Sequence, residues 1–215
     1  MIAFSGLDGA GKSTQIELLQ KYFTTKGIDS FILWSRGGYT PGINSLKKLL
    51  RFTGNKNIPQ KNGSSKERDN LFKNKFVRKM WLFLALLDLI WFYIVYIRIK
   101  EAIGTQIICD RYIFDTSIDF KLNYKKDKVE SWLLWKVMIF LAKKPKKHFV
   151  FTITAKESLI RSKLKNEPFP DSEETLENRL NDYLNFIATK KEIIHIDGNI
   201  SIEETHNFIT QELTK

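Results

Sequence analysis

The sequence is poor in the residues that mark several protein classes. It has one cysteine, Cys109, which excludes an internal disulfide framework, and its three histidines show no zinc-ligand spacing. With only 5 Pro and 11 Gly beside 43% hydrophobic residues, the chain is neither collagen-like nor disordered. The first residues lack the basic start of a signal peptide. We therefore expect a cytoplasmic protein.

Positive charge, by contrast, is in excess. The chain holds 35 Lys and Arg against 24 Asp and Glu, which gives a formal net charge of +11. Such a surplus attracts anionic partners, but by itself it does not distinguish a nucleotide from a nucleic acid or an acidic lipid surface. The class of ligand has to come from the motifs.

Short apolar runs alternate with longer helical stretches along the chain. This alternation predicts an α/β fold, with a doubly wound parallel five-stranded sheet flanked by helices, in a single domain over 1–215. The expected strands are 1–5, 31–34, 105–109, 148–153 and 192–196. The expected helices are 12–26, 69–103, 129–142, 156–165, 173–189 and 202–213. Residues 53–70, rich in Asn, Gly, Ser and Lys, are predicted to form a mobile loop.

One segment is almost apolar enough to be a membrane span. Residues 80–97 are interrupted only by Asp88. An aspartate near the centre of a span costs about 2.5 to 3.5 kcal/mol on insertion scales. The segment also stands between a nucleotide motif and a predicted sheet strand. We therefore expect no membrane span but a core helix that also packs against a second subunit of a homodimer.

The strongest motif is a G-x-x-x-x-G-K-S loop. It follows the first predicted strand and precedes the first predicted helix, which is the context of a phosphate-binding loop. Backbone N–H groups of such a loop surround phosphates, and the positive end of the helix adds to their field. We predict that Lys12 reaches the β- and γ-phosphates of ATP and that Ser13 ligates Mg²⁺. The predicted ATP-binding residues of the loop are Gly6, Leu7, Asp8, Gly9, Ala10, Gly11, Lys12, Ser13 and Thr14.

The loop alone does not identify the phosphoryl acceptor. A GTPase needs Asn-Lys-x-Asp, and the nearest match, 55–58, lacks the aspartate. Motor ATPases usually carry a glutamate after the aspartate that ends the second core strand, whereas here Arg111 follows Asp110. An arginine beside a metal-facing carboxylate suits a second anionic substrate better than it suits the activation of water. The pair favours a kinase with a small anionic acceptor.

These motifs resemble those of the thymidylate kinase family of P-loop kinases. Residues 4–14 are close to the family's opening, and 36–42 resemble its Arg-Glu-Pro-Gly-Gly-Thr segment without the Glu-Pro. Residues 110–112 match its Asp-Arg-Tyr, Tyr183 matches a tyrosine after its lid, and 196–198 resemble the segment bordering the adenine. The resemblance implies a P-loop NTPase fold. It also implies transfer from ATP, with Mg²⁺, to a nucleoside monophosphate, most simply dTMP.

The resemblance also implies roles at the acceptor site. Asp8 would face the acceptor sugar and its 3′-hydroxyl. Arg36 and Arg111 would hold the acceptor phosphate, and Tyr112 belongs to the same substrate-binding motif. Asp110 would arrange the metal and its waters. The acceptor site would therefore lie directly beside the phosphate-binding loop.

A lid over residues 161–175 would complete the site. Arg161 and Lys165 stand where the family carries two basic residues. Together with Lys163 they would bring positive charge over the transferring group, with Lys165 binding ATP. Catalysis would consist of alignment and charge neutralisation. The residues expected to be catalytic are Lys12, Asp110 and Arg161.

The acceptor site also departs from the family. Before the Asp-Arg-Tyr motif the family carries a thymine-stacking aromatic and, four residues later, a phosphate-binding arginine, where this chain has Leu86 and Ile90. Two alternatives stay open. One is a kinase of the same fold that acts on a nucleoside or a non-nucleotide alcohol. The other is a non-enzymatic nucleotide-binding module at a membrane or on nucleic acid, although the favoured interpretation expects neither partner.

Overall fold

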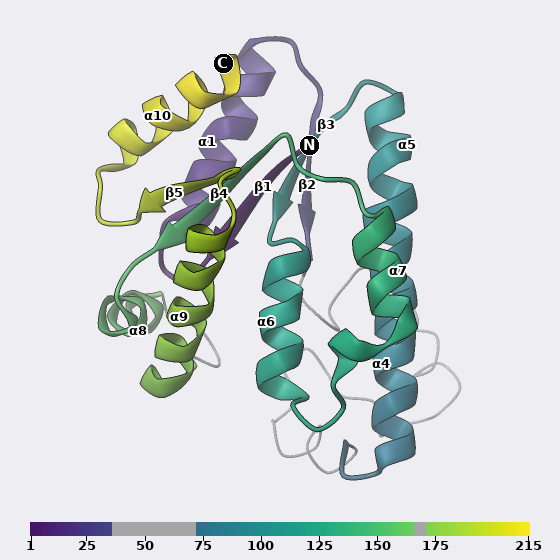
Figure 1. Ribbon diagram of the computed structural model, residues 1–215. Coiled ribbons are helices and arrows are strands. Elements are labelled where there is room, and N and C mark those ends of the chain that lie inside the picture. The colour runs from purple at the N-terminus through teal and green to yellow at the C-terminus, as the bar shows by residue number, and fades with distance from the viewer. Residues whose placement is uncertain (36–71, 166–170) are drawn as a thin grey trace.

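The computed structural model describes residues 1–35, 72–165 and 171–215, and its centre is a parallel sheet (Figure 1). The five strands lie in the order β2-β3-β1-β4-β5, which confirms the predicted α/β fold class. The strands are β1 (Ile2–Gly6), β2 (Ser30–Trp34), β3 (Gln106–Asp110), β4 (Lys147–Thr152) and β5 (Ile193–Asp197). Every strand end lies within one residue of its predicted position.

Helices pack on both faces of this sheet. The helices of the described residues are α1 (Lys12–Thr25), α4 (Lys75–Ile90), α5 (Ile97–Ala102), α6 (Ile113–Asn123), α7 (Leu133–Leu141), α8 (Ala155–Leu164), α9 (Glu173–Thr189) and α10 (Ile202–Thr214). A π-helical segment, η1 (Trp91–Tyr96), joins α4 to α5, and a 3-10 turn, η2 (Val129–Ser131), precedes α7. The sequence patterns do not predict α6, and the predicted loop at 53–70 lies outside the described residues.

The side chains of β1 alternate between two hydrophobic clusters. Ile2 and Phe4 pack with residues of α1, α9 and α10. Met1 and Ala3 pack with residues of α4 and α7. Because successive side chains of a strand point to opposite faces, both faces of the central strand are buried. Polar chemistry is therefore left to the carboxyl ends of the strands, where open α/β sheets bind their ligands.

The apolar segment 80–97 forms part of one continuous helical run through α4, η1 and α5. Among the described residues this run, Lys75–Ala102, is long and apolar enough to cross a membrane by length and composition. Of its most apolar window, 39% is buried inside the protein. Leu82, Leu86 and Leu89 lie in the second hydrophobic cluster. One side of the run thus belongs to the core, as predicted.

Candidate active site

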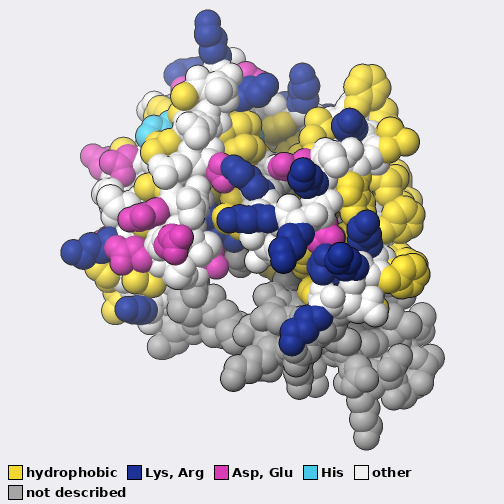
Figure 2. Space-filling view, turned by 60° about the horizontal axis from the view of Figure 1, so that its bottom comes forward, with side chains coloured by type: hydrophobic (Ala, Val, Ile, Leu, Met, Phe, Trp, Pro, Cys, Tyr) yellow, Lys and Arg dark blue, Asp and Glu magenta, His cyan; other side chains and the backbone are white. Residues whose placement is uncertain are grey.

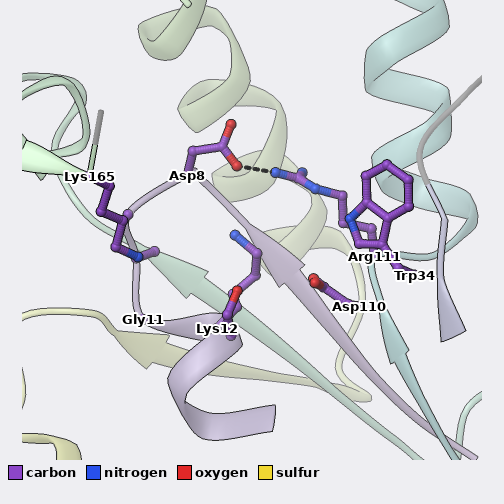
Figure 3. Close-up of a pocket in the computed structure, with 10 residues that line it drawn as sticks. Asp8, Gly11, Lys12, Trp34, Asp110, Arg111 and Lys165 are labelled. Atoms are coloured by element: carbon purple, nitrogen blue, oxygen red, sulfur yellow. Dashed lines mark hydrogen bonds and ion pairs between the residues drawn. The ribbon is translucent and has the colours of Figure 1, made fainter. Parts of the chain in front are cut away.

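The predicted functional groups meet at the carboxyl ends of β1 and β3. These strands are parallel neighbours with Phe4 opposite Asp110, and the backbone N–H of Arg111 donates to the carbonyl oxygen of Phe4 over 2.8 Å. One pocket at this edge is lined by Asp8, Gly9, Ala10, Gly11, Lys12, Ser13, Trp34, Asp110, Arg111 and Lys165. The phosphate-binding loop and the Asp-Arg pair therefore face the same space (Figure 3).

Backbone contacts fix the shape of the loop. Gly6 has a φ of 133°, and a Cβ atom there would lie 2.0 Å from the carbonyl oxygen of Phe151 in β4. Gly11, with a φ of 94°, is the residue before α1, which begins at Lys12. Both backbone conformations favour glycine. The loop therefore delivers the first N–H groups of α1 to the pocket, as anion binding requires.

Lys12 lies buried at the centre of the site. Its Nζ atom donates to the carbonyl oxygens of Gly6 over 2.9 Å and Leu7 over 2.6 Å. Burial, reinforced by the positive charge of Arg111, lowers the pKa of Lys12 to about 8. The nearby carboxylate of Asp110 is also largely buried, and this burial raises its pKa. An incoming polyphosphate would favour the charged form of the ammonium group.

Arg111 is held by carboxylates on two sides. Its guanidinium forms an ion pair with Asp8, the dashed contact in Figure 3, and its Nη1 atom lies 3.5 Å from Oδ1 of buried Asp115. Burial opposes the charge of Arg111, yet the carboxylates, Asp8 foremost, raise its pKa well above the usual value. Tyr183 in turn donates to Asp115 over 2.6 Å. The arginine is therefore charged and oriented toward the pocket.

The basic residues Arg161 and Lys163 of α8, and Lys165 directly after it, differ in their placement. Lys165 lines the pocket, and Lys163 is an exposed residue outside its lining. Arg161 also lies outside the lining, and its Nη1 atom donates to the carbonyl oxygens of Gly9 over 3.2 Å and Gly198 over 2.9 Å. Arg161 thereby joins the phosphate-binding loop to the turn after β5.

Several other predicted residues contribute indirectly or lie elsewhere. Tyr112 is buried outside the pocket lining, and its hydroxyl donates to the carbonyl oxygen of Lys143 over 2.6 Å. Arg36 lies outside the described residues. The loop residues that do not line the pocket are Gly6, Leu7 and Thr14.

One pocket residue, Trp34, was not predicted from the sequence. It ends β2, where it pairs in register with Asp110. That position carried a signal, because the carboxyl ends of neighbouring parallel strands meet at one edge of a sheet. A tryptophan at the end of the second predicted strand was therefore a candidate for the site.

The pocket contains oxygen donors suited to a divalent cation. Asp110 and Ser13 both line it. The described part of the chain holds no group of three or more His, Cys, Asp or Glu side chains arranged for a metal. Mg²⁺ usually keeps several waters and binds through one or two protein ligands together with substrate phosphates. The donors present therefore fit Mg²⁺ that arrives with a nucleotide.

Basic side chains are prominent on this side of the molecule. The strands in Figure 1 point toward the lower end of the molecule, and Figure 2 turns this end toward the viewer. Lys and Arg side chains gather across the middle of the face that Figure 2 shows. A surface of one charge sign raises the local concentration of oppositely charged ligands. Part of the excess positive charge, +11 for the whole chain, thus lies on the face that an anionic substrate would approach.

Comparison with known proteins gives one consistent family. Residues 4–209 match the thymidylate kinase family. The thymidylate kinase of Buchnera aphidicola subsp. Baizongia pistaciae is 27% identical over 222 aligned residues, covering 99% of this chain and 93% of that protein. The thymidylate kinase of Thermosipho melanesiensis is 27% identical over 209 residues, covering 94% of this chain and 91% of that protein. The predicted resemblance is confirmed.

Proposed function

The chain belongs to the thymidylate kinase family, and from that premise we propose that it transfers the γ-phosphoryl group of ATP to dTMP, giving dTDP and ADP. The observation that carries this proposal is that the phosphate-binding loop lines the same pocket as Asp110 and Arg111. Direct transfer between two bound anions requires both to be held in one water-poor space. A binding module for one nucleotide would need only the loop.

The donor half of the mechanism rests on the loop. The N–H groups at the start of α1 and the ammonium of Lys12 bind the β- and γ-phosphates and stabilise charge that moves during transfer. Lys165, which lines the same pocket, adds a second positive charge. Arg161 supports the loop through the carbonyl group of Gly9 and turns toward the nucleotide only if it leaves that contact.

Ser13 and Asp110 would hold Mg²⁺ in this site. Both line the pocket with oxygen donors, the ligand type that Mg²⁺ prefers. The ion, when bound with ATP, supplies charge neutralisation between the phosphates. The chain's own part is to present a carboxylate and a hydroxyl beside the loop.

The acceptor half depends on an exchange of partners at Arg111. In the structure its guanidinium pairs with Asp8, whose side chain is partly exposed to the pocket. A phosphate monoester offers more charge and a bidentate geometry, so it displaces Asp8 from the arginine. Asp8 is then released toward the acceptor sugar, in agreement with the role that the family resemblance implies. Asp115 stays behind Arg111 and keeps the guanidinium in place.

One observation favours a second candidate function. Leu86 and Ile90 are aliphatic, so neither supplies the aromatic or the arginine that the family resemblance implies for dTMP. Leu86 is also completely buried, and Ile90 packs against the same cluster. A nucleoside or a non-nucleotide alcohol would not need the missing arginine. We retain such a kinase as the alternative.

A panel of acceptors separates the two functions. ADP release is followed with ATP and Mg²⁺ in the presence of dTMP, thymidine, other nucleoside monophosphates, or simple alcohols. We expect turnover with dTMP and little with thymidine, because Arg111 requires a phosphate partner. Turnover with thymidine and none with dTMP would replace the proposed function with the alternative.

The proposal extends to the assembly and its location. We propose a homodimer through the outer face of 80–97, because exposed apolar side chains gather there and on α7.

We also propose that residues 1–215 act as one domain with a lid over 161–175, of which 166–170 lie outside the described residues. A cytoplasmic location agrees with the low cysteine content.

A further inference from the structure

The ring of the acceptor needs a surface to pack against, and Leu86, where the family carries its stacking aromatic, does not provide one. Leu86 has 0% of its surface exposed and lies in the second hydrophobic cluster, so no ligand reaches it. Ile90 packs against that cluster as well. Neither of these aliphatic residues therefore offers a surface to a ligand.

The tyrosines nearest the site are committed to other contacts. The Tyr93 hydroxyl bonds to that of Ser35 over 2.7 Å, and the ring is fully buried. The Tyr112 hydroxyl donates to a main-chain carbonyl away from the pocket. Tyr183 is fully buried and donates to Asp115. None of these three rings presents a face to the pocket, since none is among its lining residues.

Trp34 is the aromatic residue among the described side chains that line the pocket. Its side chain is 39% exposed although it stands at the end of a sheet strand. It is in register with Asp110 and lies beside Arg111 in Figure 3. A large, partly exposed indole in the lining of a charged pocket gains from contact with an apolar, planar ligand.

We propose that Trp34 is the stacking surface for the ring of the acceptor, beside the arginine that holds its phosphate. A ring surface beside this arginine fits an acceptor that carries a planar heteroaromatic ring as well as a phosphate, which is the chemical class of a nucleoside monophosphate. This inference rests on the proposed function, which it deepens. It assigns base binding to β2, whereas the family resemblance implies the helix that precedes β3.

Stacking has a recognisable signature in substrate selection. Every base has a π face, so an indole discriminates poorly among bases but strongly between an acceptor with a ring and one without. Stacking of one base on an aromatic side chain corresponds to roughly a tenfold to hundredfold effect on binding. Gly11 and Lys165 lie on the side of Lys12 away from Trp34 in Figure 3, so ATP binding should not depend on the indole.

The test compares Trp34→Ala and Trp34→Phe with the wild-type full chain. We expect Trp34→Ala to raise the KM for dTMP about tenfold to hundredfold, Trp34→Phe to restore most of the loss, and the KM for ATP to stay unchanged. Phe208→Ala, which removes an exposed aromatic on α10 far along the chain, is the matched control and should leave both constants unchanged. Circular dichroism checks that each variant is folded.

A ringless acceptor separates stacking from a structural effect. Binding of 2-deoxyribose 5-phosphate, measured by calorimetry, should be equal in wild type and Trp34→Ala, whereas dTMP binding should be weaker in the variant. Equal dTMP binding in the two proteins, or equal weakening of both ligands, would overturn the role of Trp34. If wild type binds dTMP through Trp34 but does not phosphorylate it, the proposed function fails while the binding site stands. If wild type does not bind dTMP, the assignment of Trp34 falls too.

Discussion

Lys12 carries its ammonium group in a buried position, where the charged form is disfavoured. Its ammonium donates to two carbonyl oxygens of the loop, yet burial still lowers its pKa to about 8. For a base, a lowered pKa means that the charged form is disfavoured above that pH in the protein without nucleotide. A bound triphosphate reverses the balance, because its negative charge favours the ammonium. Protonation of Lys12 is thus coupled to ATP binding.

This coupling predicts proton uptake when ATP binds at alkaline pH. At pH 9, above the Lys12 pKa of about 8, wild type should take up about one proton per ATP, whereas at pH 7 Lys12 is already charged and contributes little. At pH 9 the ATP phosphates, whose last pKa is about 6, are fully ionised and do not obscure the effect. The measurement is calorimetry of ATP binding in two buffers with different ionisation enthalpies.

Lys12→Arg is the matched control for proton uptake. A guanidinium stays charged in proteins, so this variant should bind ATP at pH 9 without the extra proton. The same proton count in wild type and Lys12→Arg would mean that another group titrates and that the lowered pKa of Lys12 has no role.

Contiguity along the chain decides which site residues sequence alone could predict. The loop from Gly6 to Ser13 was predictable because its chemistry lies within one short stretch between a strand and a helix. The placement of Arg161 was not, because its partner Gly9 lies 152 positions away and only the folded chain brings them together. Asp110 and Arg111 were predictable as a pair, but their approach to Asp8 depends on the register of β1 and β3.

At the scale of elements, α6 illustrates a limit of periodicity. Its buried residues include Asp115 and Asp119, so the segment does not read as an amphipathic helix. Both carboxylates acquire partners from distant elements, Tyr183 for the first and Arg179, at 2.7 Å, for the second. A buried charge is tolerated when it is paired. The helix therefore depends on α9, which no local pattern indicates.

The long helix that contains Leu86 gives an element-scale prediction. Since Leu86 is fully buried, Leu86→Ala should lower the free energy of unfolding by about 2 to 5 kcal/mol through lost burial and a cavity. The KM for dTMP should change little, because the side chain is a core residue and not a ligand contact. Urea unfolding measures the first quantity and steady-state kinetics the second.

Leu184→Ala provides the comparison for Leu86→Ala. Leu184→Ala removes the same side-chain atoms from α9. Because Leu184 is 44% exposed, this substitution should lower the stability much less than Leu86→Ala. Equal urea midpoints for the two variants, or a raised KM for dTMP in folded Leu86→Ala, would contradict the assignment of Leu86 to the core.

At the scale of the whole molecule, basic and apolar side chains occupy different parts of the surface. Apolar side chains run along the right edge of Figure 2, the side on which Figure 1 draws α4, α5 and α7. Phe83 and Trp91 on the long helix are 42% and 51% exposed, and Leu133 and Phe140 on α7 are 76% and 85% exposed. Monomeric proteins rarely leave so many large side chains uncovered on neighbouring helices. A two-fold interface would cover the same patch on both copies.

The proposed dimer leads to a prediction about assembly. The double variant Phe83→Asp and Phe140→Asp should convert the dimer to a monomer, since each copy would have to bury unpaired carboxylates in an apolar contact. Ile202→Asp, on the exposed start of α10, introduces the same charge elsewhere and should leave the dimer intact. Sedimentation equilibrium at micromolar concentration reports the mass of each protein. A monomeric wild type, or a double variant that stays dimeric, would rule out this face as the interface, and the apolar side of 80–97 would then require another partner.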